Sequence, residues 1–313
     1  MPKLTLFLMF FLATLSAAAF AQEEPRAVPG TLNYVEGSVS VTTNAGLQRV
    51  TPRSIGSTVL GAGQFVQTGA GKAEILLTPG VFLRLGANSA VMMVSPDGAH
   101  TEVELERGRA DVEVDHLSRQ SYLLIDQKDG GTQLLKPGLY AFDANKNTMR
   151  VFEGEAAVFA GEGSKAGEPV NQKGVTVKAG HELAVNAVLA KPHGFDKDRA
   201  AAQDSLYRWG SMRSGYLGEE NLNLAESYAG GGGFAPGWTW DSDYYDYTWL
   251  PGDGLFWSPF GFGFYSPFYL RGGGFVYGRG GYGGFRGGGF AAGRVGGGFG
   301  GGARGGGGGG GHR

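Results

Sequence analysis

The chain has 313 residues, no cysteine and a formal net charge of −2 at pH 7. The lack of cysteine excludes disulfides, thiol catalysis and thiolate metal sites, so any folded part depends on a hydrophobic core. The charge is uneven, because residues 271–313 contain six arginines and no acid, which leaves 20 basic and 29 acidic residues in residues 22–270.

The N-terminal residues have the pattern of a secretory signal peptide. An uncharged apolar run follows Lys3 and ends in a small-x-small motif at residues 19–21. This order is typical of a signal peptide that is cleaved after Ala21, and a retained membrane anchor is the alternative. We therefore predict a signal peptide over residues 1–21, export to the periplasm, outer surface or extracellular space, and no transmembrane segment after cleavage.

Residues 28–190 carry the pattern of an all-β domain. Short apolar runs are separated by Gly, Pro, Asn and Asp, and apolar residues alternate with polar ones. This alternation predicts strands with one solvent-facing side. The run Thr78-Pro79-Gly80-Val81 predicts a type II turn between two strands, because Pro and Gly suit its two central positions.

The clearest alternation is in TEVELERGRADVEVD at residues 101–115. Its apolar parity changes across Gly108, which predicts a hairpin with a turn or a bulge there. Asp111, Glu113 and Asp115 then share one face of the second strand. We interpret that face as solvated and protective against edge aggregation, and a calcium site is the alternative.

A five-residue pattern, G-x-[AV]-x-V, occurs at residues 37–41, 108–112 and 154–158. The repetition indicates one β unit that is used several times, with glycine at the turn before each strand. Chance recurrence among many Gly and Val residues is the alternative.

Residues 29–186 resemble the FecR-type domain family. The resemblance rests on the pattern at residues 37–41, on GSTVLGAGQFVQTGAGKAEILL at residues 56–77 and on VFLRLGANS at residues 81–89. It implies an all-β, sandwich- or roll-like module of the bacterial envelope. The founding members are regulators that span the inner membrane and pass iron-uptake signals to a sigma factor. This chain has a signal peptide where they have a cytoplasmic helical domain, so it looks more like exported FecR-domain proteins with aromatic, glycine-rich C-terminal regions.

The sequence of residues 195–228 predicts one helix, and it is expected to begin near Asp196 because acids occupy its first turn. Its apolar stripe consists of Ala202, Leu206 and Trp209. The stripe is expected to dock on the β domain, and a free linker helix is the alternative. Asp204 and Arg208 have the i,i+4 spacing of an ion pair. Gly210 and Gly215 lower the helix propensity of the second half of this predicted helix.

Residues 229–270 form an aromatic region rich in Pro and Gly, and residues 271–313 form a tail rich in Arg and Gly. The tail is predicted to be disordered, because it cannot bury enough surface to offset its backbone entropy. The aromatic region could stack on sugar rings, pack on the β domain as a flap, self-associate, or stay disordered with transient contacts. The candidate interaction surface comprises Trp238, Trp240, Tyr245, Tyr247, Trp249, Trp257, Arg271, Arg279 and Arg286.

Together these features predict a non-catalytic, exported envelope protein without cofactor or metal. Its FecR-like part is interpreted as a binding or assembly module, and its C-terminal region as a contact for an envelope protein, a polysaccharide, an anionic surface or a second copy. The tail alone is typical of RNA binding, but export makes nucleic acid an unexpected partner. One alternative is a periplasmic signal-sensing component related to iron-uptake sigma-factor regulation. Another is a hydrolase that acts on envelope polymers.

Overall fold

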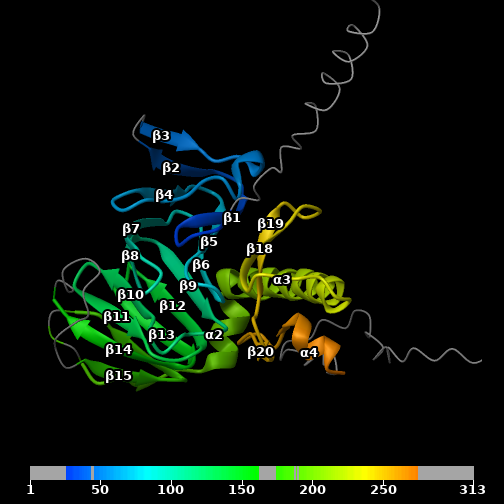
Figure 1. Cartoon of the computed structure of the whole chain (residues 1–313). Coiled ribbons are helices and arrows are strands. Elements are labelled where there is room, and N and C mark those ends of the chain that lie inside the picture. Colours follow the sequence, from blue (N-terminus) through cyan, green and yellow to red (C-terminus); the bar gives the residue numbers. More distant parts are fainter. Residues whose placement is uncertain (1–25, 44–45, 162–173, 187, 189, 274–313) are drawn as a thin grey trace, which may run out of the picture.

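The computed structural model describes residues 26–43, 46–161, 174–186, 188 and 190–273 (Figure 1). The predicted signal peptide and the predicted disordered tail beyond residue 273 lie outside the described residues. The described part folds into two large β-sheets, a long helix and short hairpins. Of the predicted all-β class, the structure therefore confirms a mostly β fold for this part of the chain.

Each large sheet is built from strands that are far apart in the sequence. Sheet A has the order β1 (Thr31–Glu36), β5 (Lys72–Leu76), β6 (Val81–Leu85), β9 (Arg109–Val114), β12 (Gly138–Asp143), β13 (Thr148–Glu153), β16 (His181–Ala184) and β17 (His193–Gly194). Sheet B has the order β15 (Val175–Lys178), β14 (Glu155–Ala160), β11 (Gly130–Leu134), β10 (Tyr122–Gln127), β8 (His100–Arg107), β7 (Ala90–Pro96), β4 (Phe65–Thr68), β2 (Val39–Thr43) and β3 (Gly46–Arg49). Strands β8 and β10 pair in parallel, whereas the other neighbours among the described strands are antiparallel.

The two sheets share one hydrophobic core. Leu32 and Val35 of β1 in sheet A belong to the same buried cluster as Val39 and Val41 of β2 in sheet B. Alternate residues of a strand point to the same side, so each sheet contributes one face to this core. Burying each such side chain stabilises the fold by about 1.5–3 kcal/mol, which makes the shared core the main source of stability.

The chain passes from one sheet to the other at the repeated glycines. Gly37 separates β1 from β2, Gly108 separates β8 from β9, and Gly154 separates β13 from β14. Their φ angles are 68°, 80° and 99°, a region that residues with a Cβ rarely adopt. In every copy the two apolar residues that follow belong to the shared core. The repeated pattern therefore encodes a left-handed turn into the opposite sheet, followed by an inward-facing strand.

The predicted type II turn between β5 and β6 is confirmed. Gly80 has φ 82°, and the Val81 amide donates to the Thr78 carbonyl at 2.8 Å. This turn reverses the chain within sheet A.

The predicted hairpin across Gly108 is wrong, because β8 and β9 lie in different sheets. Strand β9 lies inside sheet A between β6 and β12. Asp111, Glu113 and Asp115 are only 2%, 0% and 3% exposed, so the interpretation of a solvated acidic face is also wrong. These three side chains point away from the shared core, but another layer of the protein covers them.

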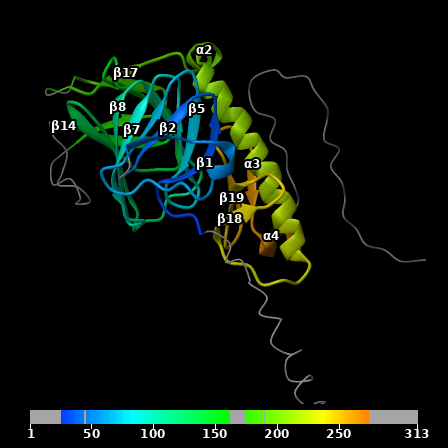
Figure 2. The ribbon, with the colours of Figure 1, turned by 90° about the horizontal axis from the view of Figure 1, so that it is seen from above.

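That layer is formed by residues 197–273, which we call the C-terminal cover. It comprises α2 (Lys197–Gln203), α3 (Ser205–Ala229), β18 (Gly237–Asp241), β19 (Asp246–Leu250), β20 (Leu255–Trp257), β21 (Gly263–Tyr265) and α4 (Pro267–Arg271). The remaining short element, the 3-10 turn η1 (Pro52–Ser54), is not part of the cover and lies between β3 and β4. Figure 2 shows α3 along one side of the sheets, with β18, β19 and α4 beside its C-terminal half. Of the predicted apolar stripe, Leu206 and Trp209 are buried and Ala202 is exposed.

The predicted single helix is divided at Asp204. Its Oδ1 accepts the backbone N–H groups of Leu206 at 2.9 Å and Tyr207 at 3.3 Å, so Asp204 caps the start of α3. The predicted pair between Asp204 and Arg208 is wrong, because the other oxygen of Asp204 binds Arg109 of β9. Arg208 instead donates to a backbone carbonyl of α2.

Helix α3 continues through Gly210 and Gly215 to Ala229, although both glycines have low helix propensity. A Cβ at Gly210 would lie 3.4 Å from the Cδ atom of Arg84, and one at Gly215 would lie 3.1 Å from the ring of Phe262. The glycines thus let the helix approach its neighbours closely, and packing outweighs propensity.

We predict that Gly108→Ala destabilises the protein by about 2–4 kcal/mol, because alanine resists a positive φ and its Cβ would lie 2.5 Å from the Ser89 Cα. Urea unfolding measures the change. Gly98→Ala is the matched control, since nothing lies within 4 Å of a Cβ there. Equal stability of the two variants would contradict the role assigned to the crossing glycine.

Candidate functional site

A buried ionic cluster joins sheet A to the C-terminal cover. Arg84 of β6 donates from Nε to Glu74 Oε2 at 2.8 Å and also pairs with Glu113 of β9. Arg213 of α3 donates from Nη2 to Glu74 Oε1 and to Asp246 Oδ2 of β19, each at 2.9 Å. All five side chains are buried. Because each charge meets an opposite charge away from water, the cluster fixes α3 and β19 in one position on the sheet.

Two asparagines attach the aromatic strands to β1 and to α3. Asn33 donates to the Tyr247 carbonyl at 2.9 Å and accepts the Tyr247 amide at 2.7 Å. Asn221 binds Tyr265 in the same two-sided way, at 3.1 and 2.6 Å, and also donates to the Trp249 carbonyl at 2.8 Å. Nothing in the local sequence marks these roles, because Asn33 and Tyr247 are 214 residues apart.

The residues of the predicted interaction surface have different environments. Tyr247 and Trp249 are buried; Trp238, Trp240 and Trp257 are half-buried; Tyr245 is 68% exposed; Arg271 is exposed; Arg279 and Arg286 lie outside the described residues. Trp249 and Tyr247 belong to a buried cluster with Phe82 of β6. This arrangement agrees with the alternative in which the aromatic region packs on the β domain as a flap.

The exposed aromatic side chains of the described aromatic region are Tyr244 and Tyr245, at the tip of the β18–β19 hairpin, and Phe268 of α4. Tyr244 and Tyr245 are 56% and 68% exposed, and Tyr245 has φ 60°. The Tyr245 ring also contacts Trp240, with centroids 6.4 Å apart. Of the predicted aromatic surface, this tip is the part that a partner could reach directly.

Among the described residues, the buried layer between sheet A and the cover holds more carboxyl groups than arginines. Burial alone would raise the pKa of Glu74, but Arg213 and Arg84 outweigh it and lower this pKa to about 2. Burial raises the pKa of Asp246 to about 6 despite the opposing charge of Arg213. The two arginines therefore keep Glu74 ionised, whereas Asp246 is only partly stabilised.

Other acids of the layer favour the protonated form. Burial, followed by the charge of Asp204, raises the pKa of Asp111 to about 8. Burial and the charge of Asp246 raise the pKa of Glu220 to about 9. Burial also raises the pKa of Asp115 well above its usual value, with Glu113 adding to the effect. The folded state consequently takes up protons that the unfolded chain releases above about pH 4.

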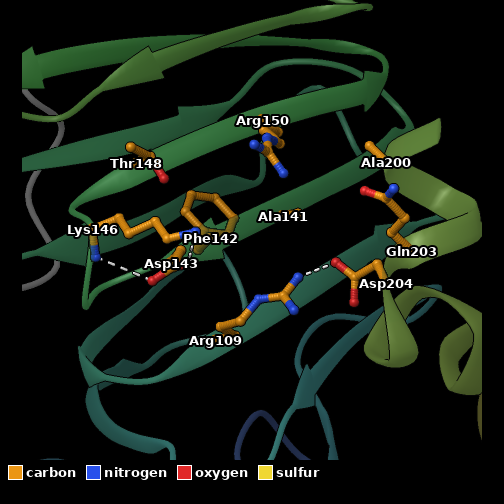
Figure 3. A pocket seen from close by; sticks show the side chains of 10 residues that line it. All are labelled: Arg109, Ala141, Phe142, Asp143, Lys146, Thr148, Arg150, Ala200, Gln203 and Asp204. Atoms are coloured by element: carbon orange, nitrogen blue, oxygen red, sulfur yellow. Dashed lines mark hydrogen bonds and ion pairs between the residues drawn. The ribbon is translucent and has the colours of Figure 1, made fainter. Parts of the chain in front are cut away.

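An open pocket of about 200 Å³ lies on the outer face of sheet A, where α2 meets α3 (Figure 3). It is lined by Arg109, Ala141, Phe142, Asp143, Lys146, Thr148, Arg150, Ala200, Gln203 and Asp204. Strands β9, β12 and β13 form one wall and the end of α2 forms the other. Figure 3 shows Arg109 directed at Asp204 and Lys146 directed at Asp143. The positively charged groups of Arg109, Lys146 and Arg150 therefore surround the small base of the pocket.

Comparison with protein families identifies the central part of the chain. Residues 64–157 match the family described as FecR protein. Residues 64–157 form a FecR domain. The domain runs from β4 into β14, so Glu74, Arg84 and Glu113 of the ionic cluster belong to it, whereas Arg213 and Asp246 lie outside.

The solved structures that are similar to this chain include two crystal structures, at 2.50 and 1.65 Å resolution, of a putative anti-sigma factor from Parabacteroides distasonis. Sequence identity is 13% and 12%, the TM-score is 0.35 for each, and each match covers 44% of this chain. The chain spans less than two thirds of those chains, 62% and 63% of their length. A comparison with curated proteins found no match.

The described residues contain no group of three or more His, Asp or Glu side chains that could hold a metal ion. Glu113 is one of the three acids for which a calcium site was the alternative interpretation. It instead binds Arg84 and accepts a hydrogen bond from the Ser214 hydroxyl. No described helix combines the length and apolarity needed to span a membrane.

We predict that Arg213→Met destabilises the protein by about 3–5 kcal/mol, because it leaves Asp246 buried without its cation. Urea unfolding followed by tryptophan fluorescence measures the loss. Arg208→Met, an exposed change on the same helix, should stay within about 0.5 kcal/mol of the parent protein. Similar losses of unfolding free energy in the two variants would show that the ionic cluster does not hold the C-terminal cover on sheet A.

The raised pKa values predict that stability falls as pH rises. An acid with a raised folded pKa binds its proton in the folded state, so its contribution decreases once the pH exceeds the unfolded value near 4 and is lost by about pH 8–9 for Asp111 and Glu220. Unfolding free energies should thus decrease between about pH 5 and pH 9. Asp111→Asn should reduce this decrease, whereas the exposed change Asp253→Asn should not. An unchanged pH profile in the Asp111 variant would contradict the assignment.

Proposed function

We propose that this chain is a non-catalytic regulatory component of the bacterial cell envelope, in which the FecR domain binds a signalling partner. The observation that carries the proposal is the FecR match over residues 64–157. The resemblance implies that domains of this kind relay envelope signals toward a sigma factor. The chain would take part in such a relay by binding, without a cofactor.

The packing of the aromatic region favours a regulatory role over an assembly role. An assembly role depends on aromatic segments that are free to contact other molecules. Here Tyr247 and Trp249 are buried, and the strands that carry them are bound by Asn33 and Asn221. The cover and the FecR domain therefore form one folded unit, in which Tyr247 and Trp249 are not free to contact other molecules.

The chemistry of the described residues supports a non-catalytic role. Asp111, Asp115 and Glu220, three of the acids with raised pKa values, are buried between sheet A and the cover, where a polymer substrate has no access. Among the described residues that line the pocket there is no histidine and no serine. The serine–histidine pair that many hydrolases use as nucleophile and general base is thus missing from this lining.

The location and partners are part of the proposal. We place the chain in the periplasm or at the cell surface, on the pattern of residues 1–21, with an envelope protein as its partner. The arginines of residues 271–313 add a contact with an anionic surface.

The proposal is tested in cells that carry a tagged full-length chain at its own locus. Crosslinking should recover a membrane receptor or a sigma-factor regulator, and deletion of the gene should change the transcripts of a defined gene set. Fractionation should place the tagged chain in the envelope. A chain that ends at residue 273 is the control, and it should keep the transcriptional effect. Unchanged transcripts together with recovery of polysaccharide alone would contradict the regulatory role and favour assembly.

A further inference from the structure

The pocket of Figure 3 exists because a small residue lies between longer ones. Ala141 of β12 is paired with Arg150 of β13 on one side and with Asp111 of β9 on the other. Asp143, two residues along β12, is paired in the same way with Thr148 and Arg109. Paired residues of neighbouring strands point to the same face of a sheet. The alanine thus leaves a hollow beside the Arg150 side chain.

The side chains around the hollow keep unused hydrogen-bond donors. Arg150 binds Glu182 through Nε, and its guanidinium lies over the Phe195 ring, 5.5 Å from the centroid. No other hydrogen bond of this guanidinium occurs within the described chain, so its two terminal nitrogens keep their donors. The hydroxyl of Thr148 and the amide of Gln203 likewise make no hydrogen bond to the described residues.

The acids of the lining are balanced by partners. Asp204 is bound by Arg109, and Asp143 lies 3.8 Å from the Lys146 ammonium. The Lys146 side chain is 75% exposed and can turn toward the hollow. Arg150, Thr148 and Gln203 therefore supply donors that the acids of the lining do not use, and Lys146 adds a positive charge beside them.

We propose that this pocket binds a carboxylate, with Arg150 as its main contact and Lys146, Thr148 and Gln203 around it. The planar guanidinium offers two parallel N–H groups that match the two oxygens of a carboxylate. A cavity of about 200 Å³ is smaller than the usual range for drug-sized ligands, so it takes a small organic acid or one acidic side chain of a protein partner. This proposal rests on the pocket geometry and not on the regulatory role.

The same pocket is connected to the helix of the cover. Arg109 lines the pocket and binds the oxygen of Asp204 that does not cap α3. The capping oxygen accepts the amides of Leu206 and Tyr207. A carboxylate that attracts Arg109 competes with Asp204 for it, so binding is expected to alter the first turn of α3.

The test titrates the full chain with succinate and, separately, with the peptide acetyl-Glu-Asp-Glu-amide, using calorimetry at low salt. Succinamide is the neutral comparison. Binding of succinate or the peptide, but not of succinamide, is expected. Tighter binding of the peptide assigns the carboxylate to a protein partner, and binding of succinate alone assigns it to a free acid. No binding of either carboxylate overturns the proposal.

Variants locate the binding. Arg150→Gln should weaken it by about tenfold or more, and Arg150→Lys should recover part of the loss because it keeps the charge without the two-pronged geometry. Lys146→Gln, an exposed change that does not threaten folding, should also weaken binding. Arg49→Gln on exposed strand β3 removes one cation elsewhere and should have no effect. Equal losses in the Arg49 and Arg150 variants would overturn the site, because they would indicate general electrostatic attraction.

The connection to α3 has its own readout. Succinate should shift the amide NMR signals of Leu206 and Tyr207, and Arg150→Gln should reduce those shifts. Binding without any change at these amides would overturn the coupling through Arg109 and Asp204.

Discussion

The buried carboxylate of Glu74 is the point on which the arrangement of this protein depends. It accepts hydrogen bonds from Arg84 of its own sheet, from Arg213 of α3 and from the Asn33 amide of β1. Removing a carboxylate from water costs several kcal/mol, and only a complete set of donors offsets that cost. Each donor must therefore lie in its place, so the charge of Glu74 selects one position for the helix relative to the sheet.

This requirement makes the FecR domain incomplete by itself. Its residues 64–157 include Glu74, Arg84 and Glu113, but further partners of these acids lie outside it: Asn33 of β1 and Arg213 and Ser214 of α3. Without the cover, the outer face of sheet A would expose a charged and apolar surface to water. The cover and the domain accordingly fold as one unit, and the pocket forms where the end of α2 leaves part of that face open.

The surplus of buried acids gives the same layer its sensitivity to protons. Asp111 and Glu220 lack an arginine of their own, so the folded state favours their neutral forms. A layer of this kind holds the cover most firmly under mildly acidic conditions. The sequence showed an acidic strand face but gave no sign that it would be covered.

The local sequence pattern was sufficient to predict the strands, the type II turn at Gly80 and the repeated glycine turns. The reason is that the two-residue period of a strand and the positive φ of a turn glycine depend on neighbouring residues. The sequence alone therefore determined a β protein with glycine at its turns and a FecR domain in residues 64–157. Only the tertiary structure decided which sheet each strand joins, and that Asp111, Glu113 and Asp115 are buried. The reason is that these outcomes depend on contacts between distant segments, such as Asn33 with Tyr247, and no periodicity within a strand reports what packs on its outer face.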